Sequence, residues 1–354
     1  GGGFDITIDQ PNNYAWHNKY PMIIGNSCYT GNIHQISSGS ASEQFVLPGN
    51  AGAIAFLASI DLGVTGSLFY STEAFYKSFC KDNYGEPIGR HMDIDAVSFT
   101  GSTVTGRKFL TYASESNLKE VTLEMGGKNP AVVLDDAENL DRVAAHVVNG
   151  AFWNMGENCS ASSRLIVQKG VKDALLKRIL AHAREWPMGD PLDPVNRVGA
   201  LVSKAHFDKV SSFLGKGPKV LLGGKAEAGF VPPTILEVAR DSVQAREEIF
   251  GPVLSVLTVD NFDEAIALAN STEYGLAASI FTANTKKAIR GARAIRAGTV
   301  TVNSFGEGDI STPFGGFKQS GFGGRDNGIH AHDQYTQIKT IWVDLADDAD
   351  EAVD

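Results

Sequence analysis

The chain has 354 residues, of which 43% are hydrophobic and 20% charged, so it can bury a core in one large or two ordinary domains. A formal net charge of −10 and the lack of any Lys/Arg run argue against a nucleic-acid partner. No apolar run approaches the roughly 20 residues of a membrane span. Three widely spaced cysteines resemble neither a disulfide framework nor a metal motif. We therefore expect a globular, cytoplasmic protein with no metal and no nucleic-acid or membrane partner.

Strands and helices alternate from about Gly85 onward, which is typical of an α/β protein with a largely parallel sheet. The expected strands are 95–99, 130–134, 164–168, 253–259, 277–282 and 298–303. The expected helices are 107–116, 140–151, 171–186, 261–270 and 286–296. Residues 1–88 show no clear period, and the stretch from Gln334, QYTQIKTIWVDL, alternates as a strand does before an acidic tail.

Cys159 lies directly after the helix expected at 140–151, in the stretch GENCSASSR. Its small neighbours leave room for a substrate carbonyl, and backbone N–H groups with a nearby base would favour its thiolate. Taken alone, a single cysteine is more often a buried structural residue. A partner for it is Glu124, which stands in LEMGGKNP beside a glycine pair that allows close backbone approach.

Several short segments occur in a characteristic order: FTGST at 99–103, LEMGGK at 123–128, GENCSASSR at 156–164, EEIFGPV at 247–253 and PFGGFKQSG at 313–321. Together they resemble the NAD(P)-dependent aldehyde dehydrogenase superfamily. The resemblance implies an α/β fold with an open, mostly parallel, Rossmann-like cofactor-binding sheet, an α/β catalytic domain and a C-terminal oligomerisation strand. It implies domains at 1–124, 125–325 and 326–354, a homodimer or homotetramer, and a missing N-terminal part.

The resemblance also assigns catalytic roles. Cys159 matches the nucleophile that forms a thiohemiacetal with the aldehyde and then a thioester. Glu124 matches the general base that activates the hydrolytic water, a task for a carboxyl group of raised pKa. Asn13, in PNNY, is the nearest match to the side-chain amide that stabilises the developing oxyanion.

The cofactor and substrate sites follow from the same resemblance. FTGSTVTG matches the turn against the nucleotide, while EEIFGP matches the residues that hold the nicotinamide ribose and flank the ring. The cofactor-binding residues expected are Gly101, Ser102, Thr103, Gly106, Glu248 and Phe250. The loop 303–316 resembles the branch that oxidises γ-glutamyl-γ-aminobutyraldehyde and other ω-amino aldehydes, with Glu307 and Asp309 placed to attract the amino end. A solvated acidic loop is an equal alternative.

These matches predict oxidation of an ω-amino aldehyde to the carboxylic acid with NAD, or NADP as the alternative cofactor. A CoA-acylating aldehyde dehydrogenase is a second interpretation, against which Glu124 argues because hydrolysis needs a water-activating base. A third is a non-catalytic homologue that serves as a binding or assembly module.

Residues 1–88 depart from the resemblance. GNS at 25–27 matches a family turn, but the Lys-Pro-Ser-Glu stretch that binds the adenosine ribose does not follow it. Such a contiguous departure indicates a damaged gene, an error in the sequence of this block, or a variant with altered cofactor binding. Because Cys159, Glu124, Glu248 and Phe250 are all kept, we favour the first two interpretations.

Overall fold

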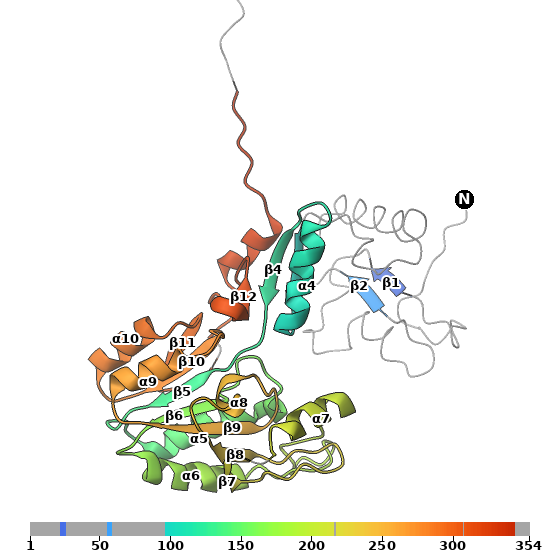
Figure 1. Cartoon of the computed structure of the whole chain (residues 1–354). Coiled ribbons are helices and arrows are strands. Elements are labelled where there is room, and N and C mark those ends of the chain that lie inside the picture. Colours follow the sequence, from blue (N-terminus) through green and yellow to red (C-terminus); the bar gives the residue numbers. More distant parts are fainter. Residues whose placement is uncertain (1–21, 26–54, 59–95, 216, 307, 344–354) are drawn as a thin grey trace, which may run out of the picture. The chain divides into compact units, whose positions relative to one another are not determined.

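The computed structural model describes residues 22–25, 55–58, 96–215, 217–306 and 308–343 (Figure 1). The chain divides into two units, Gly1–Ile94 and Asp95–Asp354. In the first, the described residues form two short strands, β1 (Met22–Gly25) and β2 (Ala55–Ala58), which pair in parallel. The domain boundaries expected near residues 124 and 325 stay a prediction.

The second unit is built on a sheet of seven strands in the order β11-β10-β5-β6-β9-β8-β7. All neighbouring strands run parallel except β7 and β8 at one edge, which pair antiparallel. The strands are β5 (Pro130–Val133), β6 (Arg164–Gln168), β7 (Lys219–Leu222), β8 (Thr234–Glu237), β9 (Val253–Val259), β10 (Ala277–Phe281) and β11 (Thr299–Val302).

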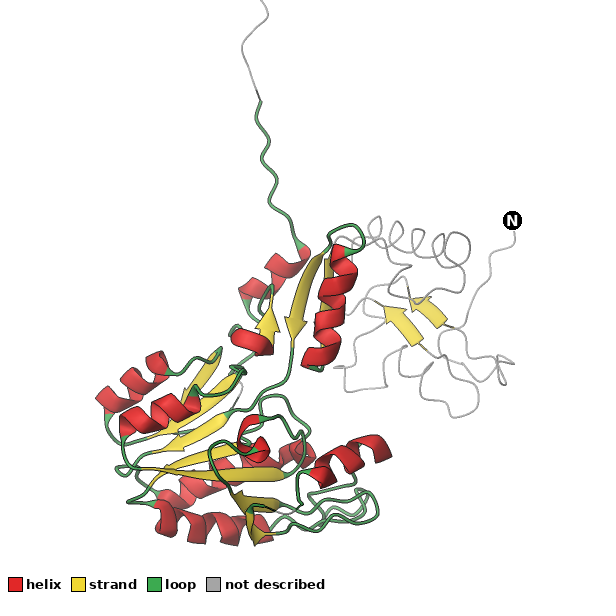
Figure 2. Ribbon diagram, viewed as in Figure 1, coloured by secondary structure: helices red, strands yellow, loops and turns green. Residues whose placement is uncertain are grey.

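Helices cover both faces of this sheet (Figure 2). On one face α5 (Leu140–Phe152) and α6 (Lys172–Arg184) pack on side chains such as Val133 and Val167. On the other, α9 (Phe262–Ala269) and the end of α10 (Thr285–Ala294) adjoin a second cluster that includes Val132 and Ile166. Because alternate side chains of a strand point to opposite faces and both faces are covered, the central strands are largely apolar, as in residues 165–167 of β6.

The helices begin where the sequence supplies capping side chains. Among the described α-helices, Ser or Asn precedes every one except α6 and accepts a hydrogen bond from a backbone N–H of the first turn, which satisfies a donor that the helix leaves unpaired. The caps are Ser102 of α4 (Thr103–Ser114), Asn139 of α5, Ser203 of α7 (Lys204–Ser212), Ser242 of the short helix α8 (Val243–Arg246), Asn261 of α9 and Asn284 of α10.

A smaller sheet of three strands stands beside the large one in the same unit, in the order β12-β4-β3. Strand β4 (Glu120–Glu124) lies between β3 (Ala96–Thr100), which is parallel to it, and β12 (Gly321–Phe322), which is antiparallel. Helix α4 packs on this sheet through a small apolar cluster that includes Ala113 and Leu123. Because β4 is held by hydrogen bonds to a strand on each side, the position of its last residue, Glu124, is fixed.

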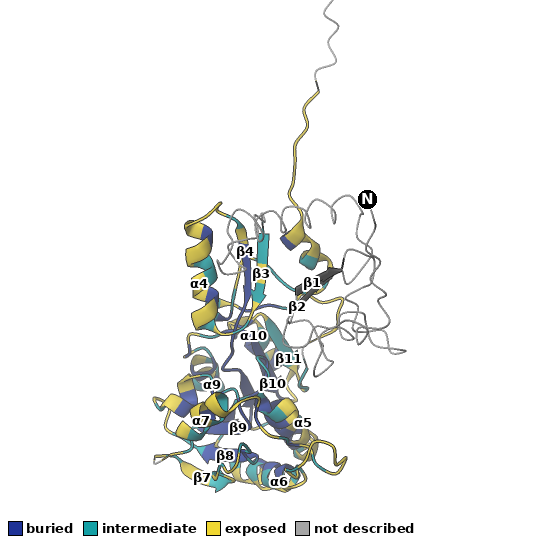
Figure 3. Cartoon of the chain, turned by 90° about the vertical axis from the view of Figure 1, so that its right-hand side faces the viewer, coloured by how far each residue is buried: buried dark blue, intermediate teal, exposed yellow. Residues whose placement is uncertain are grey.

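Three short 3₁₀ helices complete the described chain: η3 (Trp153–Gly156), η4 (Lys318–Ser320) and η5 (Ile329–Tyr335). Residues 336–343 follow η5 as an exposed stretch, visible in Figure 3. The large apolar side chains of Ile338 and Trp342 in this stretch are exposed to solvent. They pair with no strand among the described residues, so the oligomerisation strand expected here stays a prediction. No helix in the described part of the chain is both long and apolar enough to cross a bilayer.

Candidate active site

Glu124 is a buried carboxyl group at the end of the central strand β4. Strand register sets it opposite Thr100 on one side and Gly321 on the other. Its residue is 4% exposed, and neither carboxylate oxygen completes a hydrogen bond with the described part of the chain. An orphaned carboxyl group is costly to bury when charged, which favours its neutral form.

The surroundings of Glu124 shift its proton affinity strongly. Burial, and secondly the nearby Asp326 carboxylate, raise the pKa of Glu124 from 4.5 to about 8. The Arg325 guanidinium and the Gly316 N–H lower this pKa, but by less. The Gly316 N–H does not complete a hydrogen bond to either carboxylate oxygen. A carboxyl group with such a pKa can exchange a proton near neutral pH, which is what a general base requires.

The glycine pair after Glu124 is the point where three sequence motifs meet. The Gly127 N–H donates to Glu248 Oε1 at 2.9 Å. A Cβ on Gly126 would overlap the Glu248 carboxylate, and a Cβ on Gly127 would lie 2.5 Å from the carbonyl oxygen of Cys159. Only glycine therefore allows LEMGGK to touch both EEIFGP and GENC.

Cys159 sits half-buried in the loop that follows α5 and η3. An amide side chain braces this loop from behind: Asn129 Nδ2 donates to the carbonyl oxygens of Cys159 at 2.8 Å and Ala161 at 3.0 Å. Asn129 Oδ1 accepts from the N–H of Ala277, the first residue of β10, at 3.0 Å. The brace ties the thiol-bearing loop to the rigid sheet, where a reacting atom can be held in place.

Two fully buried cations lie behind the glycine pair, and the sequence reading missed both. The Arg164 guanidinium donates to the carbonyl oxygens of Lys128, Leu268 and Ala269. Lys128 Nζ is buried with no hydrogen-bond partner among the described residues. Burial, and secondly the charge of Arg164, lower the pKa of Lys128 to about 7, while Glu248 acts in the opposite direction.

Glu248 and Phe250 occupy the loop before β9. Burial raises the pKa of Glu248, whereas the Gly127 N–H and the positive charges of Lys209 and Lys128 lower it. Phe250 has a left-handed backbone, with φ of 60°, a conformation that costs an ordinary residue about 1 kcal/mol or more. Its carbonyl oxygen lies 2.6 Å from Nε2 of His206, a residue that the sequence reading did not single out.

The residues of the expected cofactor turn have internal partners in the described chain. The Gly101 N–H donates to the carbonyl oxygen of Glu124 at 3.0 Å, and Ser102 caps α4. Gly106 is buried, and a Cβ there would lie 2.5 Å from the sulfur of Met125. Thr103 Oγ1 contacts the carbonyl oxygen of Gln319 at 3.4 Å. These contacts link the turn to the strand that carries Glu124.

The remaining sequence-predicted residues are not brought into this arrangement. Asn13 and Glu307 lie outside the described residues. Asp309 is exposed, and its Oδ1 accepts from the N–H and the hydroxyl of Ser311 at 2.9 and 2.7 Å, bonds that lower the pKa of Asp309. Within the described ranges, no group of three or more His, Cys, Asp and Glu side chains could hold a metal ion.

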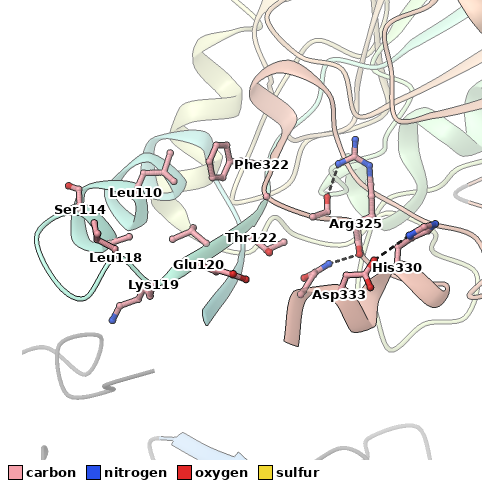
Figure 4. Close-up of a pocket in the computed structure, with 15 residues that line it drawn as sticks. Leu110, Ser114, Leu118, Lys119, Glu120, Thr122, Phe322, Arg325, His330 and Asp333 are labelled. Atoms are coloured by element: carbon pink, nitrogen blue, oxygen red, sulfur yellow. Dashed lines mark hydrogen bonds and ion pairs between the residues drawn. The ribbon is translucent and has the colours of Figure 1, made fainter. Parts of the chain in front are cut away.

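A cavity of about 830 Å³ opens beside the small sheet, between α4, β4 and the segment around β12 and η5 (Figure 4). Apolar side chains such as Leu110 and Phe322 line part of it, and polar residues including Arg325 and Asp333 line the rest. Neither Cys159 nor Glu124 contributes to its wall, so we do not assign the cavity to the chemistry of those residues.

The fold is a largely parallel α/β sheet with helices on both faces, and the site combines a thiol in a braced loop with a buried carboxyl group of raised pKa. The aldehyde dehydrogenase family model matches residues 80–341, and the chain belongs to this family. This confirms the resemblance and the fold class inferred from the sequence. A model of peptidase family C25 also matches residues 4–114, most of which lie outside the described residues.

Relatives and solved structures support this membership. The aminoacetaldehyde dehydrogenase of Pseudomonas aeruginosa is 66% identical over 268 residues, which cover 74% of this chain and 54% of that protein. The NADP/NAD-dependent aldehyde dehydrogenase PuuC of Escherichia coli is 42% identical over 267 residues, with the same coverage of each protein. The chain therefore spans about half the length of the curated relatives it matches.

Among solved structures, a mutant of the P. syringae indole-3-acetaldehyde dehydrogenase AldA, in complex with NAD+ and IAA, superposes with a TM-score of 0.71 at 45% identity. The match covers 74% of this chain and 56% of that one. The γ-glutamyl-γ-aminobutyraldehyde dehydrogenase of Burkholderia cenocepacia gives a TM-score of 0.69 at 40% identity, covering 82% and 57% of the two chains.

Proposed function

We propose that this chain carries the catalytic part of an NAD-dependent aldehyde dehydrogenase that oxidises an ω-amino aldehyde to the carboxylic acid. The observation that carries the proposal is the meeting of three motifs at Gly126 and Gly127. There the segment that follows the strand of Glu124 contacts both the Cys159 loop and the Glu248 carboxylate. Family membership and the names of the relatives agree with this activity.

The residues present fit a dinucleotide in their donor and acceptor chemistry. The N-terminus of α4 follows the glycine-bearing turn at Gly101 and Ser102, and the first N–H groups of a helix are of the kind that bind a pyrophosphate, so the start of α4 would hold that group. The Glu248 carboxylate offers acceptors for ribose hydroxyls, and Phe250 would flank the nicotinamide ring. When bound, NAD supplies the hydride acceptor; NADP is the alternative.

The chain's own residues account for the other steps. The Cys159 thiolate adds to the aldehyde carbonyl, and loss of hydride from the thiohemiacetal leaves a thioester. Glu124 takes a proton from the water that attacks this thioester, and its pKa of about 8 suits a base that must lose the proton again. Because that base serves hydrolysis, the carboxylic acid is the product we expect rather than an acyl-CoA.

The catalytic assignment is tested with the purified chain, NAD and an aldehyde, by following NADH. We expect C159A to give no NADH. E124Q should release at most one NADH per active site and then stop, because the thioester forms but is not hydrolysed. Steady turnover by C159A would refute the role of Cys159, and unchanged turnover by E124Q would refute that of Glu124. A wild-type chain that folds but neither binds NAD nor forms NADH would favour a non-catalytic role.

For the substrate class, the relatives named for aminoacetaldehyde and γ-glutamyl-γ-aminobutyraldehyde both point to an amino aldehyde. Both bonds to Ser311 use Oδ1 of Asp309, which leaves Oδ2 outside them to attract an ammonium group. We expect D309N to raise KM for amino aldehydes and to leave it nearly unchanged for neutral ones. The matched control is D193N, since Asp193 Oδ1 likewise accepts the N–H two residues on, from Val195. An equal change in KM for both substrate types would refute this role.

We also propose that residues 336–343 pair with a second subunit of a homodimer or homotetramer. Their exposed apolar side chains, Ile338, Ile341 and Trp342 among them, support this. Truncation after Tyr335 should lower the number of subunits per particle, measured by sedimentation velocity. An unchanged number of subunits would refute the assignment. Three widely separated cysteines support our proposal that the protein works in a reducing compartment, the cytoplasm.

A further inference from the structure

A histidine on α7 lies between the loop of Cys159 and the loop of Glu248. His206 Nε2 is 2.6 Å from the carbonyl oxygen of Phe250 and 3.3 Å from Oε1 of Glu157. A carbonyl and a carboxylate oxygen only accept hydrogen bonds, so we assign the hydrogen to Nε2. The N–H is hydrogen bonded to the Phe250 carbonyl, and the Glu157 carboxylate oxygen lies within electrostatic contact of the same nitrogen.

Both ends of this link stand close to groups of the proposed chemistry. Glu157 precedes Cys159 by two residues, and Phe250 follows Glu248 by two. The side chains of Glu157 and His206 are only 9% and 14% exposed, so water competes weakly for their contact. His206 therefore connects two loops: residues 157–163, which carry Cys159 and are called the nucleophile loop, and residues 247–252, which carry Glu248 and Phe250 and are called the cofactor-side loop.

The partners of His206 are held in conformations that need outside support. Phe250 is left-handed, with φ of 60°, and its ring meets the edge of the His206 ring at a centroid distance of 5.8 Å and an angle of 73°. Glu157 Oε1 also accepts from the N–H of Val202 at 3.1 Å. The carboxylate is thus fixed from two sides, and the strained Phe250 backbone is retained by a hydrogen bond and a ring contact.

Packing under the histidine places the same three segments in contact. A Cβ on Gly251 would lie 2.8 Å from a methyl carbon of Val210, which is one turn further along α7. A Cβ on Gly156, itself left-handed, would overlap the carbonyl of Gly251. Helix α7 and the two loops are therefore closely packed at Val210, Gly251 and Gly156.

We propose that His206 is a positioning residue that couples the cofactor-side loop to the nucleophile loop, because its Nε2 is hydrogen bonded to the Phe250 carbonyl and in contact with the Glu157 carboxylate. The inference rests on the proposed function in one respect, namely that Cys159 is the nucleophile. Removing the N–H leaves Glu157 with the Val202 N–H alone and relaxes Phe250, and both changes loosen the loop that holds the thiol.

The test measures how fast iodoacetamide alkylates Cys159 in the full chain, without cofactor or aldehyde, by mass spectrometry of its peptide. H206F keeps a ring against Phe250 but has no N–H, and we expect about fivefold faster alkylation, the effect of one net hydrogen bond. H206Q carries a donor nitrogen as many bonds from Cα as Nε2 and should restore the wild-type rate. H182F, at a histidine on α6 that contacts Asp141, is the matched control.

Urea unfolding of each variant separates loop loosening from loss of the fold. If H206F does not fold, E157L removes the acceptor from the other end and should accelerate alkylation in the same way. In E157L/H206F, the combined effect should be smaller than the sum of the two single effects, because both substitutions remove the His206–Glu157 contact, although E157L also removes the acceptor of the Val202 N–H. Alkylation at the wild-type rate in H206F, or equal changes in H206F and H206Q, would overturn the coupling. Failure of the proposed function is seen separately, as absence of NADH formation by the wild-type chain.

Discussion

Replacing Glu124 by Gln should change how the stability of the protein depends on pH. The wild-type carboxyl group is buried without a hydrogen-bond partner among the described residues, and burial raises its pKa from 4.5 to about 8. The folded state therefore holds a proton that the unfolded chain loses near pH 4.5. The stabilising effect of that proton is complete below the unfolded pKa and is lost as pH rises through the folded pKa. Gln has nearly the same shape and carries no charge at any pH.

The size of the effect follows from the two pKa values. A carboxyl pKa moved from 4.5 to about 8 corresponds, at about 1.4 kcal/mol per pH unit, to about 5 kcal/mol of unfolding free energy lost when Glu124 is ionised. Between about pH 5.5 and about pH 9, roughly 3 kcal/mol of this is lost. All other titrating groups are common to both proteins, so they cancel when E124Q is compared with the wild type.

The assay is urea unfolding of both proteins at these two pH values. We expect the unfolding free energy of E124Q minus that of the wild type to grow by about 3 kcal/mol from the lower to the higher pH. E120Q is the matched control, because it removes one negative charge at the exposed start of the same strand. If the difference between E124Q and the wild type stays constant with pH, the burial argument for Glu124 is wrong.

Three further substitutions test individual contacts, each by urea unfolding. G127A should lower the unfolding free energy by about 1–3 kcal/mol, because its Cβ would meet the Cys159 carbonyl. G170A, whose Cβ has ordinary contacts, should be neutral or slightly stabilising, and equal effects of the two would contradict the close approach. R164M leaves three buried carbonyl oxygens without their donor and should cost at least about 3 kcal/mol, so a loss below about 1 kcal/mol would contradict their importance. K204A breaks an exposed ion pair with the carboxylate four residues on and should change stability by less than about 0.5 kcal/mol, and a larger loss would show that surface pairing matters here.

The regular elements of the large sheet could be predicted from the sequence because their patterns are local. The apolar runs at 130–133 and 253–259 and the three- and four-residue spacing in 140–152 each reflect one element packed on its neighbours. Strand β4 escaped notice, since its short stretch carries charge at both ends and pairs with strands both before and after it in the chain. Strands β7 and β8 and helix α7 were missed as well, and His206 with them.

Family resemblance singled out Cys159 and Glu124, but the sequence did not indicate what surrounds them. Lys128 looks like an ordinary surface lysine beside a glycine pair, yet it is buried with Arg164. Asn129 shows no pattern that distinguishes it from any loop amide, although it braces the Cys159 loop. Burial of a polar side chain depends on residues far away in sequence, and local patterns carry no record of them.

The sequence by itself determined the fold class, the order of most elements and the family, because hydrophobic periods and short glycine-bearing motifs are written in consecutive residues. Only the tertiary structure decided that Glu124 loses its hydrogen-bond partners on burial, that Gly126 and Gly127 bring three motifs into contact, and that His206 links two loops. Each of these depends on contacts between segments distant in the chain. Such contacts arise when the whole sheet has packed, and the free energy of a buried charge or a close approach is set there.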